Sequence, residues 1–354
     1  MSTENRPAPG AAQPTEQQLE AAARDAAEAW GLDVAELELV SLSENVVFRV
    51  DTARGDRQAL RLPRPGYNSL AEMESELIWV EALRGAGIDA PTPLRAAGGE
   101  GYVEVRVPLG SDDPDGTPTG APVDSADAPP GHEVRLAGLI EWVDGVNLDE
   151  LLDLAILAPT ANPDTDVDEV IRRYHRIGGL LAALRRHGET WDPPPGFTRR
   201  RWDADGLVGP DPLWGRFWEV PTERSDRELF NATRAALHRR LSGLPTDRTR
   251  FGLVHADLHS RNVMVDGDRM IIIDFDDAGF GWYVHELAVA IEPVLDESWA
   301  ATAHAALIEG YRSVHPLGDD EVSLIDAFCT IRKLMTIGWL AARPELGLDA
   351  ALNA

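Results

Sequence analysis

Apolar and polar residues alternate in the amino-terminal part of the chain. The alternating segments are residues 36–52 and 57–63, joined by a turn over residues 53–56. A period of two places successive side chains on opposite faces of a sheet, so these segments predict antiparallel strands. Residues 101–109 and 133–145 add two segments of the same kind. The pattern therefore predicts an antiparallel sheet before residue 146.

Two segments beside these strands have the spacing of helices instead. Residues 15–30 have Thr15 in position to cap a helix, with Gln18 three residues further on and Gly31 as the stop. A Thr and a Gln at this spacing form a capping box. Residues 69–87 predict a long amphipathic helix that ends at its glycines.

From Asn147 onward the pattern is mostly helical. Helices are predicted over residues 147–157, 166–188 and 224–244, and several more follow residue 284. The interruptions are three short β-type segments, LVHADLH, NVMVD and RMIIIDF. This order predicts an α+β fold with two lobes: a small antiparallel-sheet lobe, and a larger, mainly helical lobe with one embedded β-ribbon.

The sequence also predicts the boundaries of the two lobes and of the segments around them. Residues 1–14 predict a disordered tail, and residues 15–138 the amino-terminal lobe. Within that lobe, residues 110–131 are rich in Pro, Gly and Asp and predict a disordered insertion, because they bury too little apolar area to offset their ordering entropy. Residues 139–145 are expected to form the interlobe hinge, and residues 146–354 the helical lobe.

Charge and cysteine content limit the partners and the compartment. The chain of 354 residues has 60 acidic and 33 basic side chains, a net charge of -27. This acidic excess, without a basic stripe, predicts no nucleic-acid partner. The single cysteine, Cys329, cannot form an intramolecular disulfide, and no apolar window suits a leader or a membrane span. A cytoplasmic location and no membrane partner are expected.

The chemistry is concentrated at a predicted hairpin. Two short apolar runs flank the turn residues 266–268, so the hairpin should bring Asp257 and Asn262 back beside Asp274. An amide oxygen and a carboxylate suit Mg²⁺, which fills its other positions with phosphates and water. Asn262 and Asp274 are therefore the candidate metal ligands. The spare carboxylate of Asp257 is the candidate base for a hydroxyl that attacks a phosphate.

These residues also carry a family resemblance. Residues 255–262 read HADLHSRN, residues 274–277 read DFDD, and residues 278–288 read AGFGWYVHELA. They resemble the phosphotransferase enzyme family, which includes aminoglycoside phosphotransferases, type II homoserine kinases and choline kinases, and in particular its stress-response kinase subset. The resemblance implies a protein-kinase-like fold, a nucleotide (ATP or GTP) and Mg²⁺, with Asp257 at the catalytic position.

The resemblance also implies a cation on the phosphates and an acid that holds this cation. The family usually has a lysine there, but Lys333 is the only lysine of this chain. Arg61 is the candidate in its place. Its expected partner is Glu76, chosen over Glu72 one turn earlier because Glu76 precedes an apolar run. A surface arginine on an edge strand is the alternative.

Other nucleotide contacts are expected at two places. The phosphate-covering turn has no glycine between residues 41 and 45, so Ser43 and Asn45 are the candidate donors there, although a plain β-turn explains the segment equally well. In the hinge, backbone groups around Glu141 and Val143 are expected to pair with the base.

Glu286 and His255 are expected to stabilise the loop over residues 255–262. The family often has Asp-Leu-Ala where this chain has Glu286 before Leu287 and Ala288, so Glu286 is expected to brace the loop with a side chain one methylene longer. His255 is expected to be a hydrogen-bonding scaffold. A zinc site in HADLH is a weaker alternative, because the motif has no further His or Cys set beside it.

The acceptor side remains the least defined. Residues 191–218 contain four tryptophans, which predict either lobe packing or a site where Trp202 and Trp214 with Asp203 and Asp205 bind an amine-bearing acceptor. The leading hypothesis is an ATP- and Mg²⁺-dependent phosphotransferase acting on a hydroxyl of a small molecule, a cationic one included. The alternatives are a protein Ser/Thr kinase and a pseudokinase module that binds nucleotide without turnover.

Overall fold

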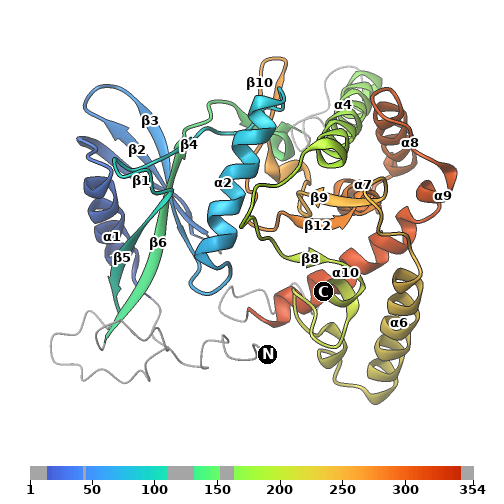
Figure 1. Cartoon of the computed structure of the whole chain (residues 1–354). Coiled ribbons are helices and arrows are strands. Elements are labelled where there is room, and N and C mark those ends of the chain that lie inside the picture. Colours follow the sequence, from blue (N-terminus) through green and yellow to red (C-terminus); the bar gives the residue numbers. More distant parts are fainter. Residues whose placement is uncertain (1–13, 43–44, 110–130, 152–162, 344–354) are drawn as a thin grey trace. The chain divides into compact units, whose positions relative to one another are not determined.

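The computed structural model describes residues 14–42, 45–109, 131–151 and 163–343 (Figure 1). The predicted tail up to residue 13, the predicted insertion over residues 110–130, and Ser43 lie outside the described residues.

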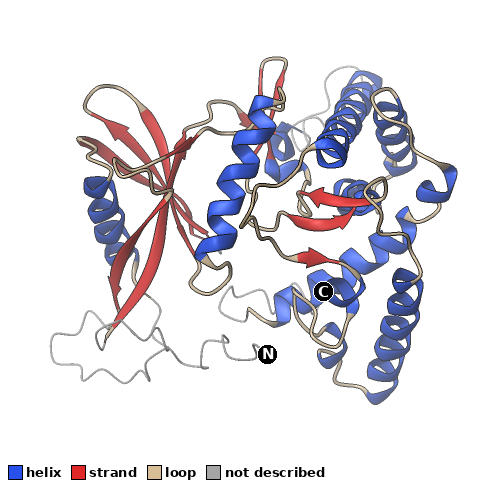
Figure 2. Cartoon of the chain, in the orientation of Figure 1, coloured by secondary structure: helices blue, strands red, loops and turns tan. Residues whose placement is uncertain are grey.

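The chain divides into two compact units. The first consists of Met1–Glu81 and Pro91–Val143, and the second of Ala82–Ala90 and Asp144–Ala354. Strands predominate in the first unit and helices in the second (Figure 2). This arrangement confirms the predicted α+β class, with an antiparallel sheet followed by a mainly helical region.

A six-stranded sheet is the centre of the first unit's described part. Its strands are β1 (Val34–Leu42), β2 (Asn45–Thr52), β3 (Arg57–Pro63), β4 (Pro93–Leu94), β5 (Tyr102–Pro108) and β6 (His132–Glu141). They are ordered β1-β2-β3-β6-β4, with β5 also paired to β6, and all these pairs are antiparallel. The alternation of apolar residues therefore predicted the pairing type correctly.

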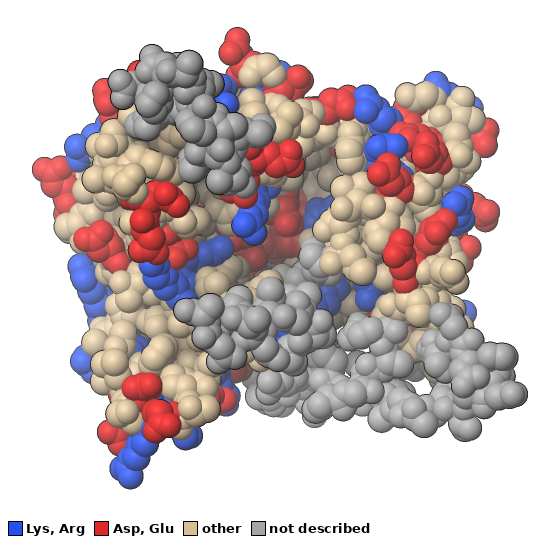
Figure 3. Space-filling view, turned by 180° about the vertical axis from the view of Figure 1, so that it is seen from behind, with Lys and Arg blue, Asp and Glu red and all other residues tan. Residues whose placement is uncertain are grey.

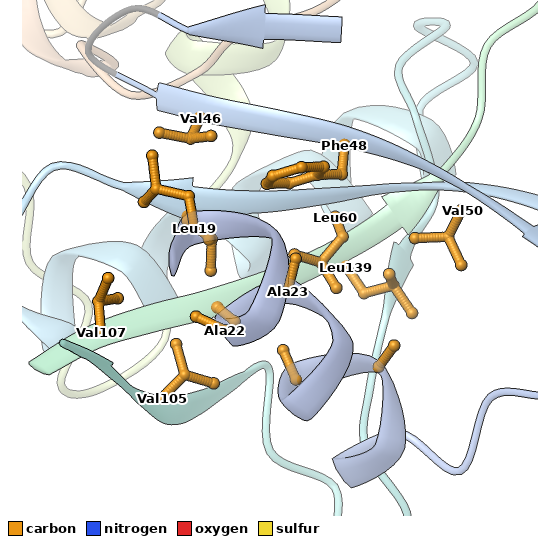
Figure 4. Close-up of a cluster of buried hydrophobic side chains, with 14 residues drawn as sticks. Leu19, Ala22, Ala23, Val46, Phe48, Val50, Leu60, Val105, Val107 and Leu139 are labelled. Atoms are coloured by element: carbon orange, nitrogen blue, oxygen red, sulfur yellow. The ribbon is translucent and has the colours of Figure 1, made fainter. Parts of the chain in front are cut away.

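Helix α1 (Glu16–Ala29) covers one face of this sheet (Figure 4). The expected capping box between Thr15 and Gln18 is present. Four buried alanines and Leu19 form the contact face of the helix, and they pack against Val46, Phe48, Val50, Leu60 and other buried strand residues. Because alanine adds almost no side chain, the helix can approach the sheet closely.

Helix α2 (Leu70–Gly85) packs on the opposite face, where Met73 and Leu77 contact Tyr102 and Leu136. A Cβ added at Gly138 would lie 2.6 Å from the ring of Tyr102, so the glycine makes room for that ring. Strand pairing places Arg61 between Val47 and Gly138 on this face. The sheet register thus turns Arg61 toward the helix that carries Glu76.

The second unit contains most of the helices. These are α4 (Pro163–Thr190), α5 (Ala204–Val208), α6 (Arg224–Ser242), α7 (Tyr283–Ile291), α8 (Ala300–Arg312), α9 (Asp319–Val322) and α10 (Ile325–Ala341), with the 3-10 turns η1 (Phe217–Glu219), η2 (Ser260–Asn262) and η3 (Glu292–Val294). Helices α4 and α8 touch through their backbones. A Cβ added at Gly310 would lie 1.8 Å from the carbonyl oxygen of His175.

The second unit also holds two small sheets, where the sequence predicted a single ribbon. The predicted hairpin, β10 (Val263–Asp266) and β11 (Arg269–Ile272), is joined by β7 (Val146–Asn147). Strand β9 (Phe251–Val254) does not join the hairpin. It pairs instead with β12 (Gly279–Trp282), whose other neighbour is β8 (Arg201–Trp202).

The prediction of one ribbon was wrong because β12 has two glycines in four residues. Glycine is a poor strand former, so the pattern did not indicate a strand there. In the structure the glycines are needed for close approach: a Cβ at Gly279 would lie 2.6 Å from the carbonyl oxygen of Arg200, and one at Gly281 would lie 2.9 Å from the side chain of Val254.

Candidate active site

The candidate site begins where β9 ends, at His255. This side chain is fully buried, and its ring nitrogen Nε2 lies 3.0 Å from the carbonyl oxygen of Ile273. Its Nδ1 accepts a hydrogen bond from the backbone N–H of Asp257, at 3.3 Å. Burial lowers the pKa of His255 to about 4, so the ring stays neutral at physiological pH. His255 therefore fixes the loop to the end of the hairpin, as a scaffold.

The next residue, Ala256, has a left-handed backbone with φ of 66°. Such a conformation costs a non-glycine residue free energy and persists only when the surroundings enforce it. The enforcing contact comes from α7: the Ala256 N–H donates to Oε1 of Glu286 at 2.6 Å. The brace expected at Glu286 is present. Burial raises the pKa of Glu286 to about 7, although the backbone donors oppose that shift.

Asp257 follows, and both of its carboxylate oxygens are engaged. Oδ1 accepts from the guanidinium Nη2 of Arg332, on α10. Oδ2 accepts from Nδ2 of Asn262 at 2.9 Å and lies 3.5 Å from Nε2 of His259. Burial alone would raise the pKa of Asp257, but Arg332 and His259 hold it well below its usual range. The carboxyl group is therefore ionised.

Asn262 lies beside Asp257 and is tied to the approach to Asp274. The Nδ2 group of Asn262 also donates to the backbone oxygen of Asp257, at 2.8 Å. The N–H of Ile273 donates to the backbone oxygen of Asn262 at 3.0 Å, which sets Asp274 directly after this link. Asp274 is exposed and has a left-handed backbone with φ of 62°. The hairpin thus brings the three predicted residues into one region.

Asn262 and Asp274 each present an oxygen atom that can bind a metal ion. Because Nδ2 of Asn262 is turned to Asp257, the amide oxygen is the atom left to meet a cation, and Asp274 offers an exposed carboxylate. Among the described residues no group of three or more His, Cys, Asp or Glu side chains is placed to hold a metal. The motif HADLH thus does not bring three such ligands together, whereas two oxygen donors fit Mg²⁺, which keeps phosphate and water ligands.

Arg199 fixes the segment that follows Asp274. Its guanidinium is buried and donates to the carbonyl oxygens of Phe275, Asp276 and Ala278 at 2.6 to 2.9 Å. Asp277 is buried and paired with Arg200 at 2.9 Å, so its carboxylate is engaged within the fold.

Residues in and just after β7 hold the 3-10 turn η2, which carries Asn262, by hydrogen bonds. Asn147 donates to the backbone oxygen of Arg261 at 2.6 Å. Asp149 accepts from the hydroxyl of Ser260 at 2.6 Å and from Nε of Arg261 at 3.1 Å. These contacts bind the loop to the segment that enters the second unit.

On the nucleotide side, Arg61 and Glu76 form the ion pair that the sequence predicted. Nη1 of Arg61 lies 3.2 Å from Oε1 of Glu76, and both side chains are largely buried. The rejected candidate, Glu72, caps the start of α2 by accepting from the N–H and the hydroxyl of Ser69 at 3.0 and 2.8 Å. The reading of Arg61 as an exposed surface arginine is therefore wrong, and its role toward phosphates stays a prediction.

The other predicted nucleotide contacts are only partly described. Asn45 begins β2 and pairs with Pro63. Glu141 ends β6, where its N–H donates to the carbonyl oxygen of Thr92 at 2.8 Å, and Val143 follows two residues later. The backbone N–H of Glu141 is thus already used, so any contact of this residue with a base would have to come from its carbonyl oxygen.

The tryptophan-rich segment packs the second unit. Trp202 and Trp214 are buried, and both indole N–H groups donate to Asp277, at 2.7 and 3.3 Å. Asp203 caps α5, and Asp205 lies 2.8 Å from His238. Of the two alternatives for this segment, packing is confirmed, and the acceptor site built from these four residues is not formed.

Charge is spread over the surface shown in Figure 3. On that face, acidic side chains lie among arginines, without a broad area of either sign. Among the described residues, no helix is both long and apolar enough to cross a membrane.

Arg332 is the site residue that sequence reasoning missed. It lies on α10, 75 residues after its partner Asp257. Its neighbours Phe328, Cys329, Ile331 and Met335 are all buried. The one available signal was an arginine inside an apolar stretch of a helix, because a buried charge is seldom found without a partner.

Comparison with known proteins assigns the chain to a family. Residues 36–317 match the phosphotransferase enzyme family. The chain belongs to that family. It is 28% identical to the amicoumacin kinase of Bacillus subtilis over 155 residues, 41% of this chain and 44% of that protein. It is 30% identical to the homoserine kinase of Methylobacterium nodulans over 184 residues, 49% of this chain and 54% of that protein. The chain spans about half the length of these curated relatives.

Solved structures of the family are similar over almost all of the chain. A microcompartment-associated aminopropanol kinase has a TM-score of 0.71 and 28% identity, covering 92% of this chain and 89% of that one. An amicoumacin kinase in complex with AMP-PNP, Ca²⁺ and Ami has a TM-score of 0.67 and 18% identity, covering 92% and 85%. The family and the protein-kinase-like fold predicted from the sequence are confirmed.

Proposed function

We propose that this phosphotransferase family member moves the γ-phosphoryl group of ATP to a hydroxyl of a small molecule, with Mg²⁺. The observation that carries the proposal is the arrangement around Asp257. The ionised carboxylate of Asp257 lies beyond the end of β9 and accepts a hydrogen bond from the amide of Asn262. The backbone oxygen of Asn262 is bonded to the N–H of Ile273, the residue before the exposed Asp274. Phosphoryl transfer needs these parts, because positioning and charge neutralisation supply most of its catalysis.

Each residue has a role in this proposal. Asp257 orients the attacking hydroxyl and accepts its proton as the new O–P bond forms, while the bond between the γ-phosphorus and the bridging oxygen breaks and ADP leaves. Asn262 and Asp274 would hold Mg²⁺, which supplies positive charge to the phosphates when bound. Arg61, fixed by Glu76, grips phosphate oxygens through its fork of donors. Ser43 and Asn45 as phosphate donors, and Glu141 and Val143 as base contacts, remain sequence predictions within it.

The acceptor is the least specified part. The names of the relatives, homoserine kinase, amicoumacin kinase and aminopropanol kinase, support a small acceptor with a hydroxyl. Homoserine and aminopropanol also carry an amine, which supports the cationic acceptor expected from the sequence. A protein acceptor has no comparable support among these relatives.

A nucleotide-binding module without turnover is the second candidate. One observation favours it: the guanidinium of Arg332 donates a hydrogen bond to Asp257, the carboxylate that would have to accept from the acceptor's hydroxyl. An ion pair of this kind weakens a base.

The test is a screen for phosphorylated product. Purified protein would be incubated with ATP, Mg²⁺ and a panel of amino alcohols, hydroxy amino acids, aminoglycosides and a generic protein, and products followed by ³¹P NMR and ADP release. Asp274→Ala tests the metal assignment, because nucleotide affinity should lose its dependence on Mg²⁺. Nucleotide that binds without any transfer across the panel would favour the second candidate, and unchanged Mg²⁺ dependence in Asp274→Ala would refute the ligand assignment.

A further inference from the structure

The guanidinium of Arg332 has one nitrogen in use and one without a partner. Nη2 donates to Asp257, and the guanidinium carbon lies 4.2 Å from the centre of the Trp214 ring. Nη1 is buried and has no hydrogen-bond partner among the described residues. The side chain is only 9% exposed, so bulk water does not replace the missing acceptor.

A buried charged donor without an acceptor is uncommon in a folded protein. Nearly all buried polar groups are paired, since an unpaired one loses its hydration without compensation. Exceptions therefore call for an explanation, such as a ligand that supplies the missing partner. Arg332 is also adjacent to a route from solvent, because the carboxylate it contacts is 19% exposed.

The position of Arg332 also opposes catalysis. Asp257 has to accept a hydrogen bond from the acceptor's hydroxyl, but its Oδ1 already accepts from Arg332 and its Oδ2 from Asn262. Asn262 also holds the backbone of Asp257 and belongs to the loop itself. Arg332 comes from α10, so it is the partner that can turn away without dismantling the loop.

On the basis of the proposed function, we propose that the acceptor carries a carboxylate close to its hydroxyl, and that Arg332 binds this carboxylate. The guanidinium then exchanges the carboxylate of Asp257 for that of the acceptor. Nη1 gains its missing partner, and Oδ1 becomes available to the hydroxyl. Arg332 selects the acceptor and couples its arrival to release of the base.

The charges near Arg332 favour a carboxylate over a phosphate. Asp257, Glu286 and Glu292 all interact electrostatically with the guanidinium. A dianion placed among these acids would be repelled more strongly than a single negative charge. An arginine fork also matches a carboxylate in geometry.

The geometry limits the length of the acceptor. Before the acceptor binds, Nη2 of Arg332 donates to Oδ1 of Asp257. A guanidinium that turns from Asp257 to the acceptor stays near Asp257, because its side chain is anchored on α10. The carboxylate and the hydroxyl of the acceptor must therefore lie close together in the acceptor. Small hydroxy acids and hydroxy amino acids satisfy this, whereas a long or rigid spacer would not.

The decisive experiment compares two acceptors that differ only in the carboxylate. L-Homoserine and 3-amino-1-propanol share the hydroxyl, the amine and the spacing between them. We expect wild-type protein to favour L-homoserine by about 100-fold in kcat/KM, because a site built to pair a polar group rejects the analogue without it. Glycerol 3-phosphate serves as the phosphate-bearing comparison and is expected to react poorly.

The variants Arg332→Gln and Arg332→Lys test the residue, with Arg343→Gln as matched control. Arg343 lies just beyond the same helix and stacks on Trp339 at 4.6 Å as Arg332 stacks on Trp214. Arg332→Gln should abolish the preference for L-homoserine, so that the ratio of kcat/KM for L-homoserine to kcat/KM for 3-amino-1-propanol falls about 100-fold. Arg332→Lys should retain part of the preference, and Arg343→Gln all of it.

Calorimetric binding of the two acceptors without ATP gives a readout that does not depend on turnover. Binding of L-homoserine that weakens in Arg332→Gln supports the inference even if no transfer is detected. Equal loss for both acceptors in Arg332→Gln, or a wild type that prefers 3-amino-1-propanol, would overturn it. In the latter case phosphoryl transfer, and with it the proposed function, would still stand.

Discussion

Two buried arginine–carboxylate pairs, one in each unit, differ in which partner is nearer the surface. In the first unit Glu76 is 3% exposed and Arg61 is 11% exposed. In the second unit Asp257 is 19% exposed and Arg332 is 9% exposed. The first pair therefore presents a cation and the second an anion. In the proposed function, the same two chemical groups would serve a phosphate in the first unit and a hydroxyl in the second, according to which partner is buried deeper.

The difference follows from the elements that carry the residues. Glu76 comes from the packed side of α2 and Arg61 from a strand facing it. Asp257 comes from a loop, while Arg332 comes from the buried side of α10. A loop residue stays closer to solvent than a residue on the inner side of a helix.

The largest effect is expected when the exposed anion is removed. Asp257→Asn keeps the shape of the side chain but removes the charge that aligns the hydroxyl. We expect kcat to fall by about 10² to 10⁴, the range for losing a positioned base, with nucleotide affinity nearly unchanged. Initial rates and calorimetric titration with ATP analogue would measure both quantities.

Asp257→Glu is the natural companion, because it restores the charge with a displaced carboxylate. If Asp257→Asn unfolds the protein, Asp257 belongs to the scaffold. If the variant turns over normally, it is not the base.

Arg61, the cation of the first pair, is the second target. Arg61→Ala should raise the KM for ATP by about 10- to 100-fold, the loss expected for charge-assisted hydrogen bonds to phosphate. Arg61→Lys should recover part of the affinity, because the ammonium keeps the charge but not the fork. The preserved pair in Arg61→Lys controls for the stability of α2. Equal nucleotide affinity in all three proteins would mean that the pair only stabilises the first unit.

Glu286 supports the anion-presenting pair and gives it a pH dependence. Its pKa is raised by burial from an ordinary value near 4.5 to about 7. The folded state therefore binds the proton more tightly than the unfolded state does. The stability contributed by this proton is fully present below pH 4.5 and is lost as the pH rises toward 7. The expected loss is about 3 kcal/mol in the free energy of unfolding.

Glu286→Gln should remove this pH dependence, because the amide does not titrate and its oxygen still accepts from Ala256. Urea unfolding of both proteins at pH 5, 6, 7 and 8 measures it. The same change of stability with pH in the wild type and in Glu286→Gln would contradict the raised pKa of Glu286, because the other buried groups, His255 among them, titrate in both proteins.

The smallest effect is expected from the deeply buried acid of the first pair. Glu76→Gln removes the negative charge that Glu76 places beside Arg61 but retains a hydrogen-bond acceptor, so the unfolding free energy should fall by about 1–2 kcal/mol. Nucleotide affinity should fall less than in Arg61→Ala. A larger loss of affinity in Glu76→Gln than in Arg61→Ala would reverse the assignment of which partner faces the ligand.

The first pair could be predicted from the sequence and the second could not. Arg61 and Glu76 were predicted because the family resemblance implies a cation on this strand and an acid on the next helix, and because Glu76 precedes an apolar run. Asp257 was predicted because it lies at the end of an apolar strand and before a hairpin. Its contact with Arg332 joins residues 75 positions apart through the packing of α10, and no local pattern encodes that packing.

The fold shows the same division. The alternating strands and the hairpin were predicted, whereas β12 was missed because its glycines serve close packing and not strand propensity. The loop predicted at Ser43 lies outside the described residues. Local periodicity thus predicted what is built from neighbouring residues, and failed where distant segments meet.

The three bonds from Arg199 bear on how this protein can be inhibited. An inhibitor that displaces Phe275 and the residues after it would have to break the bonds from the buried guanidinium of Arg199 to Phe275, Asp276 and Ala278. Each such loss costs about 1–3 kcal/mol, so the displaced form would be scarcely populated. Compounds that bind Asp257 directly would leave these bonds intact and would meet no such barrier.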